Sequence, residues 1–105
     1  MAEQFQNVTV TAKANIFFDG KVVSHTIHLG DGSRKTLGLI YPGLFTFNVG
    51  TSERMEIIAG SCRVRIGATG AWQEYTAGAF FDVPAGSFFE ISVADGIVEY
   101  ICSFA

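Results

Sequence analysis

Basic residues are scarce in this sequence, and a long apolar run is absent from it. Seven Lys and Arg side chains stand against ten Asp and Glu, which gives a formal net charge of −3. Nucleic acids and anionic membranes bind basic surfaces, so the composition argues against both as the main partner. No stretch approaches the roughly 18 apolar residues of a membrane helix. We expect no nucleic-acid partner and no membrane partner, while a local cationic pocket for a small anion stays open.

Cysteine is also scarce. Cys62 and Cys102 lie singly within apolar, strand-like runs and form no CxxC pair. This pattern favours reduced core cysteines over a disulfide, a zinc site or a nucleophile. The first residues, MAEQFQNVTV, show no basic segment followed by an apolar one, as a signal peptide would. We therefore expect a cytoplasmic protein.

Apolar and aromatic side chains are abundant instead. They include ten Phe in 105 residues, and 49% of the chain is hydrophobic. A chain of this length buries a core as one domain without disulfides or metals. So many large rings indicate a tightly filled barrel, an apolar pocket or a subunit interface. Together with the strand edges, they lead us to expect a homodimer.

Short alternating runs separated by glycine and proline predict an all-β sandwich or barrel of about ten strands. The run KVVSHTIHL, for example, places Val22, Ser24 and Thr26 on one face and Val23, His25 and Ile27 on the other. The run ERMEIIA is too short and too β-branched for a helix and predicts a strand. We expect residues 1–13 to form a leader strand and residues 14–105 to form the barrel domain. The expected strands are 8–12, 15–18, 21–29, 35–41, 44–49, 53–59, 62–66, 72–76, 80–83, 88–93 and 97–104.

The stretch GAFFDVPAGSFFEI, residues 78–91, predicts two strands that meet at a Pro-Ala-Gly corner. Its spacing, Gly78, five residues, Pro84, one residue, Gly86, resembles the second conserved motif of the cupin superfamily. Phe89 stands where that motif has a histidine metal ligand. The resemblance implies a cupin-like β-barrel, or jelly roll, without the usual metal.

The first cupin motif is present only in part. Glu53 and Gly60 match its glutamate, six residues and glycine, whereas its histidine pair is missing. His25 and His28 lie outside both motifs, and residues three apart on a strand point to opposite faces. We expect the two histidines to be solvent-facing or satisfied in the core rather than ligands.

A wider set of landmarks resembles one family of small single-domain cupins, the pyrimidine/purine nucleoside phosphorylases, from about Ala14 to the end of the chain. The landmarks are Phe18-x-Gly20-Lys21-Val22, Phe45-Thr46-Phe47, Glu53-x-Met55 with Gly60, Trp72-x-x-Tyr75-x-Ala77-Gly78-x-x-Phe81-x-Val83-Pro84, Ser87-x-Phe89 and Tyr100-x-Cys102. Membership implies a pentosyltransferase of broad specificity, in which phosphate attacks the anomeric carbon of a nucleoside and releases a free base and α-D-ribose 1-phosphate. It implies nucleosides and inorganic phosphate as partners, and neither a cofactor nor a metal.

Such chemistry needs a cation for phosphate and a carboxylate near the developing positive charge. Arg34, which follows the Gly-rich loop 30–33, and Lys21 match family positions and are the phosphate candidates. Glu53 stands at the cupin carboxylate position, and we predict that it and Arg34 are catalytic. Asp82 is a further acid candidate within the second motif. The alternative for Arg34 and Lys21 is a solvated strand-end charge, and for Glu53 it is a capping glutamate or an ion pair beside Arg54.

Three aromatic residues are predicted to contact the substrate. Phe89 replaces a metal ligand and should face the cavity, and Phe47 and Tyr100 are placed with it. A ring that stacks on a base tolerates every base, which suits broad specificity. The alternative, that phenylalanines only fill the barrel, holds for most of the ten.

Two other functions stay open at this stage. One is a non-catalytic cupin module that binds a small metabolite in an apolar cavity. The other is a cupin isomerase or epimerase acting on a sugar nucleotide, which needs a His–Asp base that neither His25 nor His28 supplies from a motif. Fold alone does not decide between these functions, because function resides in the site.

Overall fold

Alternating residues along the chain form eleven strands and one short 3-10 turn in residues 4–105, the part that this computed structural model describes. The strands are β1 (Thr9–Val10), β2 (Asn15–Phe17), β3 (Val22–His28), β4 (Arg34–Ile40), β5 (Gly43–Asn48), β6 (Glu53–Ala59), β7 (Ser61–Ile66), β8 (Gln73–Thr76), β9 (Phe80–Val83), β10 (Phe88–Val93) and β11 (Val98–Phe104). The 3-10 turn η1 (Phe18–Gly20) joins β2 to β3.

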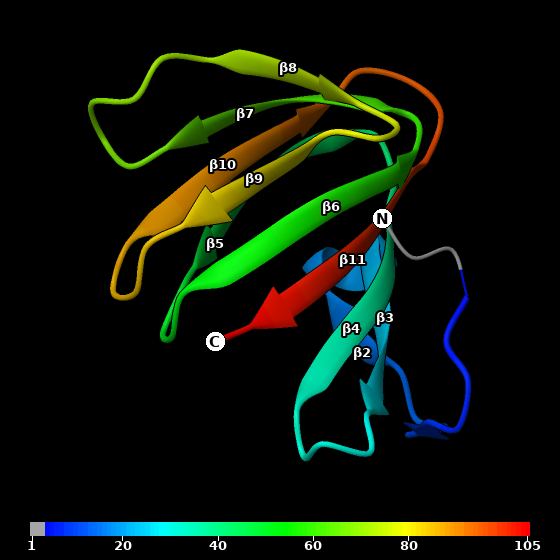
Figure 1. Cartoon of the computed structure of the whole chain (residues 1–105). Coiled ribbons are helices and arrows are strands. Elements are labelled where there is room, and N and C mark those ends of the chain that lie inside the picture. Colours follow the sequence, from blue (N-terminus) through cyan, green and yellow to red (C-terminus); the bar gives the residue numbers. More distant parts are fainter. Residues whose placement is uncertain (1–3) are drawn as a thin grey trace.

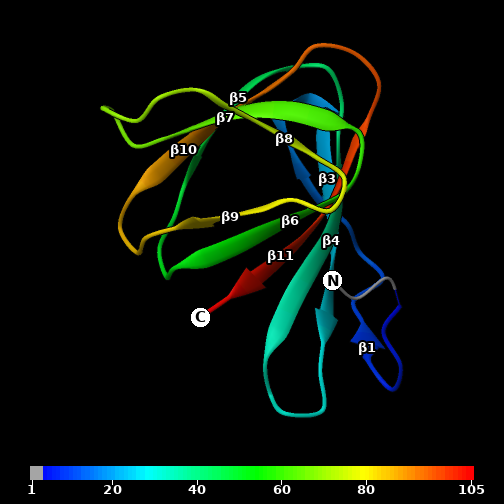
Figure 2. The ribbon, with the colours of Figure 1, turned by 45° about the horizontal axis from the view of Figure 1, so that its top comes forward.

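Two antiparallel sheets face each other and enclose the interior (Figures 1 and 2). The larger one has seven strands in the order β1-β3-β4-β11-β6-β9, and β2 also pairs with β3. The smaller one has the order β5-β10-β7-β8. Neighbours such as β4 and β11 are distant in sequence, so the barrel depends on long-range pairing.

The core lies between the inner faces of the two sheets. In β6 the buried residues are Met55 and Ile57, and in β10 they are Phe89, Ile91 and Val93, which gives the period of two of a strand with one face inward. Burying one such side chain stabilises the fold by about 1.5–3 kcal/mol. The same period decides which polar side chains point into the barrel.

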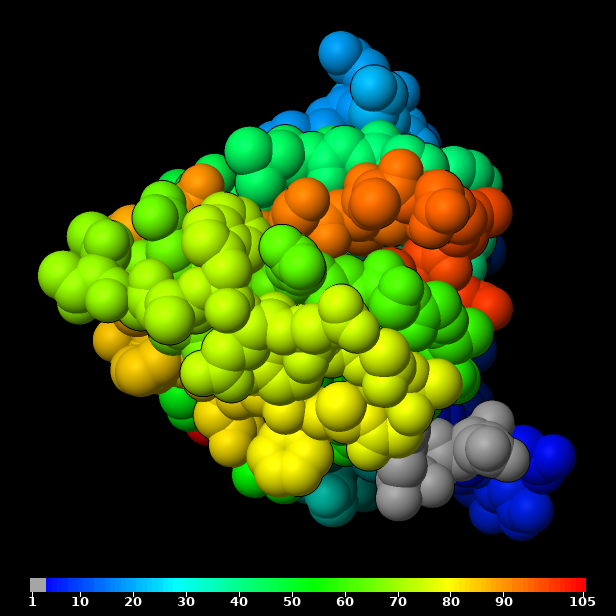
Figure 3. Space-filling model, turned by 90° about the horizontal axis from the view of Figure 1, so that it is seen from above, coloured from blue at the N-terminus to red at the C-terminus, as the bar shows by residue number. Residues whose placement is uncertain are grey.

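The motif glycines fulfil backbone requirements at turns. Gly60, between β6 and β7, has φ +83°, and a Cβ there would lie 2.5 Å from the carbonyl oxygen of Ile97. Any other residue would clash with the turn that leads into β11 and would also strain the backbone. Gly86 has φ +74° and turns β9 into β10. Figure 3 shows this end of the barrel, where the β6–β7 turn (green) lies against the turn before β11 (orange).

The structure confirms the all-β prediction and the strand, rather than a helix, at Glu53–Ala59. The predicted run 8–12 is shorter than expected, since only Thr9 and Val10 pair with β3. Residues 1–3 of the predicted leader lie outside the described residues, and its separation from the barrel stays a prediction. No helix in the described part of the chain is long and apolar enough to cross a membrane.

Candidate active site between the sheets

A cavity of about 300 Å³ opens between the two sheets. Its volume lies at the lower end of the range of small-molecule sites, about 300–1,000 Å³. Strands of both sheets line it, mainly with inward-facing side chains. The lining residues are Asn15, Phe17, Ser24, Thr26, Arg34, Thr36, Ile40, Phe47, Asn48, Glu53, Met55, Phe89, Tyr100, Cys102 and Phe104.

Strand register arranges the wall of the larger sheet in rows. Glu53 lies opposite Phe104, and Arg34 begins β4 beside them. Two residues farther along β4, Thr36 lies opposite Thr26 on one side and Cys102 on the other. Charged side chains therefore occupy one end of the wall and neutral ones the rest.

Arg34 provides a cation at the charged end. Its guanidinium carbon lies 4.0 Å from the centroid of the Phe104 ring. Arg34 takes part in neither of the two ion pairs found within residues 4–105. A guanidinium held over a ring and not engaged in a direct ion pair is suited to bind an anion such as phosphate.

Glu53 shares the charged end and is half-buried. Its Oε1 lies 3.3 Å from the Sγ of Cys102, whose thiol donates to the carboxylate. Burial raises the pKa of the Glu53 carboxyl above its ordinary value, and the Cys102 hydrogen bond and the charge of Arg34 partly oppose that rise. Burial and the neighbouring Glu53 raise the pKa of the Cys102 thiol, so this cysteine stays a neutral donor.

Hydroxyl and amide groups make up the neutral wall. The Nδ2 of Asn15 lies 3.1 Å from the Oγ1 of Thr26 and 3.3 Å from the Oγ of Ser24. The Tyr100 hydroxyl belongs to the same wall, and burial raises the pKa of Tyr100 to about 12. No member of this wall carries a charge near neutral pH.

Tyr100 fits against β4 because residue 38 is a glycine. A Cβ at Gly38 would lie 2.5 Å from the Tyr100 hydroxyl oxygen. The ring therefore lies over the β4 backbone instead of filling the cavity. Gly38 thus keeps the space open that a substrate would need.

Aromatic rings form the facing wall. Phe47 and Phe89 stack with centroids 5.3 Å apart, and Phe17 meets Phe47 edge-on at 6.3 Å. Phe18 and Asp19 adopt left-handed φ values of 53° and 56°, and this turn brings the Phe18 ring within 5.4 Å of Phe47. A neutral hydrogen-bonding wall facing an aromatic wall suits a flat, polar-edged ring.

The structure brings five of the seven predicted site residues to this cavity, namely Arg34, Glu53, Phe47, Phe89 and Tyr100. The other two do not line it. Lys21 is exposed after the β2–β3 turn, and Asp82 lies on the outer face of β9. Asp82 accepts from Arg54 Nε at 2.8 Å, and this pair lowers the pKa of Asp82. Their predicted roles stay predictions.

Sequence reasoning missed several lining residues: Asn15, Phe17, Ser24, Thr26, Thr36, Cys102 and Phe104. A signal for two of them was present, because the alternation of β3 puts Ser24 and Thr26 on the same face as buried Val22. Asn15 gave no such signal. It reaches the cavity only because β2 pairs with β3, with Asn15 opposite Ser24.

The cavity does not suit the metal that many cupins hold. Phe89 offers no ligand atom, the Cys102 thiol is held protonated, and Arg34 places a positive charge beside Glu53. Within residues 4–105, no group of three His, Cys, Asp or Glu side chains gathers to bind a metal. His25 and His28 are exposed and on opposite faces of β3, as predicted.

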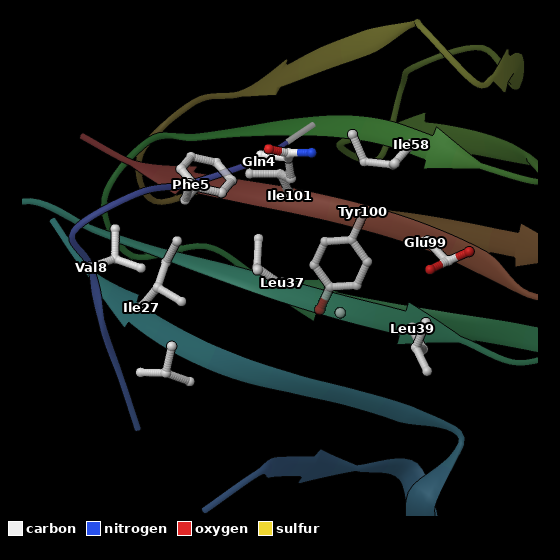
Figure 4. A pocket seen from close by; sticks show the side chains of 12 residues that line it. Gln4, Phe5, Val8, Ile27, Leu37, Leu39, Ile58, Glu99, Tyr100 and Ile101 are labelled. Carbon is white, nitrogen blue, oxygen red and sulfur yellow. The ribbon is translucent and has the colours of Figure 1, made fainter. Parts of the chain in front are cut away.

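A second cavity, of about 420 Å³, lies on the outer face of the larger sheet (Figure 4). The segment at Phe5 and Val8 faces Ile27, Leu37 and Ile101 across it. Glu99 is the one charged side chain among its lining residues in the described chain, and no cation lines it. It therefore lacks the group that a phosphate site requires.

Comparison with known proteins gives consistent results. Residues 12–104 match the family described as pyrimidine/purine nucleoside phosphorylase. A relative of that name from Cupriavidus pinatubonensis is 55% identical over 101 residues, which cover 96% of this chain and 95% of the relative.

Solved structures agree with this comparison. A protein of unknown function from an Acinetobacter species superposes with a TM-score of 0.93 at 41% identity, covering 97% of this chain and 98% of the other. Oxalate decarboxylase from Bacillus subtilis, at 14% identity and a TM-score of 0.73 over 92% of this chain and 28% of the other, shares the cupin fold alone. The chain belongs to the pyrimidine/purine nucleoside phosphorylase family, on a small cupin barrel, as the sequence landmarks predicted.

Proposed function

We propose that this protein catalyses the phosphorolysis of purine and pyrimidine nucleosides in the cavity between the two sheets. The proposal rests on the presence of both Arg34 and Glu53 at one end of an otherwise neutral, aromatic cavity. Family membership supports the reaction class, and the relatives carry the name of both purine and pyrimidine substrates.

The reaction breaks the bond between C1′ and the base nitrogen and forms a bond between C1′ and a phosphate oxygen. The electron pair of the broken bond leaves with the base, which takes up the proton that the attacking hydrogen phosphate loses. Positive charge develops on the ribose ring as the base departs. The protein must therefore place an anion on one side of C1′ and stabilise positive charge beside it.

Arg34 fulfils the first requirement in this proposal. Its guanidinium offers several donors to phosphate oxygens, and the Phe104 ring limits its freedom. Glu53 fulfils the second, with its carboxylate accepting from ribose hydroxyls and facing the developing positive charge. Cys102 orients that carboxylate by donating to Oε1.

In this proposal the base occupies the space enclosed by the rings of Phe47, Phe89 and Tyr100. Stacking on an aromatic ring discriminates little between bases, which accords with broad specificity. Lys21 and Asp82 do not line the cavity, and the steps described here do not require them.

We also propose a cytoplasmic homodimer that packs through the outer face of the larger sheet. Leu37, Leu39 and Ile58 line the outer cavity and are only partly buried, so they form an apolar surface there. Burial of such a face is a common basis for symmetric dimers. Light scattering during size-exclusion chromatography distinguishes a mass near 23 kDa from the chain mass of 11.3 kDa.

The activity is tested by incubating the purified protein with uridine, adenosine and inosine, with and without phosphate. We expect free base and ribose 1-phosphate in equal amounts, and only when phosphate is present. A saturable thermal shift with nucleoside and no free base from any of the three would contradict the proposal and indicate a binding module instead.

A further inference from the structure

We propose that Asn15, together with Ser24 and Thr26, reads the edge of the bound base, and that its amide rotates by 180° so that it either accepts from an amino group or donates to an oxo group. The inference rests on the proposed function, since it assigns the base to the neutral part of the same cavity. It names a specificity device that stacking alone does not supply.

The hydrogen bonds of the Asn15 amide leave its oxygen available to a ligand. Both hydrogens of Nδ2 are directed to hydroxyls, Oγ1 of Thr26 at 3.1 Å and Oγ of Ser24 at 3.3 Å. The Oδ1 of Asn15 takes part in none of the side-chain hydrogen bonds found within residues 4–105. Because Asn15 lines the cavity, this oxygen is available to a ligand donor.

The hydrogen bonds in the cluster of Asn15, Ser24 and Thr26 can reverse their direction. A hydroxyl donates or accepts with almost no movement of its oxygen, and a 180° turn of the amide exchanges Oδ1 and Nδ2. After the turn, Thr26 and Ser24 donate to Oδ1, and Nδ2 becomes available to the ligand. The same heavy-atom positions thus offer an acceptor in one state and a donor in the other.

The distances along β3 and β4 are consistent with a base edge at this cluster. The row of Thr26 and Thr36 lies two residues from the row of Arg34, and the row of Ser24 lies four residues from it. With a strand rise of about 3.3 Å per residue, these rows lie roughly 7 and 13 Å from the phosphate candidate. A phosphate at Arg34, followed by a ribose and then a base, spans a length of this order.

The bases of the expected substrates differ in the polar group at their edge. Adenine and hypoxanthine differ at one ring position by an amino against an oxo group, and cytosine and uracil differ in the same way. A fixed donor or acceptor would reject one member of each pair, because a buried polar group left facing a like group is costly. A reversible amide accepts both members, while the Phe47 wall accepts both ring sizes.

Asn15→Asp removes the reversibility, because a carboxylate only accepts. One oxygen then takes the Ser24 and Thr26 hydroxyls, and the other presents an acceptor to the base. We expect kcat/KM for adenosine relative to inosine, and for cytidine relative to uridine, to rise by roughly tenfold or more. Asn48→Asp makes the same charge change on the cavity rim, outside the cluster, and should affect both members of a pair equally.

Asn15→Leu is the second variant, similar in size and without hydrogen-bonding groups. It should lower kcat/KM for all four nucleosides by roughly tenfold and leave the ratio within each pair unchanged. Unchanged ratios in Asn15→Asp, or unchanged rates in Asn15→Leu, would overturn the inference while phosphorolysis by the parent protein stands.

Calorimetry with the free bases separates this inference from the proposed function. If the parent protein releases no base from any nucleoside, the proposed phosphorolysis is wrong, but the role of Asn15 in recognising bases can still be tested by binding. Asn15→Asp should then lower the affinity for hypoxanthine relative to adenine, and for uracil relative to cytosine, by the same factor of roughly ten. Equal changes for both members of each pair, or no binding of any base, would overturn the inference.

Discussion

The two ends of the inner cavity differ in charge. Arg34 and Glu53 stand at one end, whereas Asn15, Ser24, Thr26, Thr36 and Tyr100 make up a wall without charge. A charged side chain is costly to bury unless a partner or a ligand compensates it. The barrel therefore keeps its charges at the exposed end, where phosphate and the developing ribose cation need them, and leaves hydrogen bonds and rings to hold a neutral base.

Arg34→Ala should give the largest effect, because it removes the only cation that lines the inner cavity in the described chain. We expect kcat/KM for phosphate to fall by about 10³-fold, as for other preorganised charges at a reacting centre. Steady-state kinetics with phosphate varied at saturating inosine measures it.

Arg54→Ala is the matched control for Arg34→Ala. Arg54 is paired with Asp82 on the outer face and lies over Phe80. Exposed ion pairs contribute about 0–1 kcal/mol, so this variant should keep its activity and nearly all its stability. An equal loss in both variants would show that the charged end has no special role.

Glu53→Gln should give the next largest effect, a fall of about 10²-fold in kcat, because an amide does not stabilise developing positive charge. Burial raises the pKa of Glu53, so the rate of the parent protein should rise with pH through a value above the ordinary range of a carboxyl. The pH profile of kcat/KM checks this, and the acidic limb should be missing in Glu53→Gln.

Stability should respond to pH in the opposite sense. The folded-state pKa of Glu53 is raised, so between the unfolded and folded pKa values the folded protein binds more protons, and stability falls as pH rises through that window. Glu53→Gln should therefore become the more stable of the two as pH rises toward neutrality. Urea denaturation of both proteins at pH 4 and pH 7 measures the difference, and a reversed trend would contradict the raised pKa.

Gly38→Ala tests the neutral wall of the cavity. A Cβ there would meet the Tyr100 ring, and forcing the ring away should cost about 1–3 kcal/mol of unfolding free energy. The displaced ring should also raise KM for nucleosides. Gly30→Ala is its control, since a Cβ at Gly30 meets nothing within 4 Å.

Phe47→Leu should have the smallest effect. It keeps an apolar side chain against Phe89 and loses only the stacking surface, worth about 1 kcal/mol. We expect KM to rise about fivefold for purine and pyrimidine nucleosides alike. A selective loss for one class would mean that Phe47 takes part in discrimination.

The sequence was sufficient for the strands because their signals are local, whereas the barrel itself was predicted from the resemblance of the Gly78–Gly86 motif. Alternating runs and the turn residues at Asp19-Gly20, Gly60 and Pro84-Ala85-Gly86 mark the strands and their ends, and the structure follows them closely. The strand at Glu53–Ala59 could be distinguished from a helix by its β-branched end. Short β1 is the exception, since its extent depends on pairing with β3.

The site was predictable only in part. Glu53 and Phe89 were found because a motif fixes their direction, and Arg34 because it matches a family position after a Gly-rich loop. Asp82 lies within the motif but between buried Phe81 and Val83, so the alternation turns it outward to Arg54. The Asn15 cluster was not predictable, because the pairing of two strands brings it together.

Phosphorolysis in this cavity should require no metal. The most direct measurement is phosphate-dependent release of uracil from uridine before and after exhaustive treatment of the protein with EDTA. We expect equal rates before and after the treatment, with ribose 1-phosphate and uracil formed in equal amounts. Loss of activity on chelation that is restored by adding a divalent metal would contradict it.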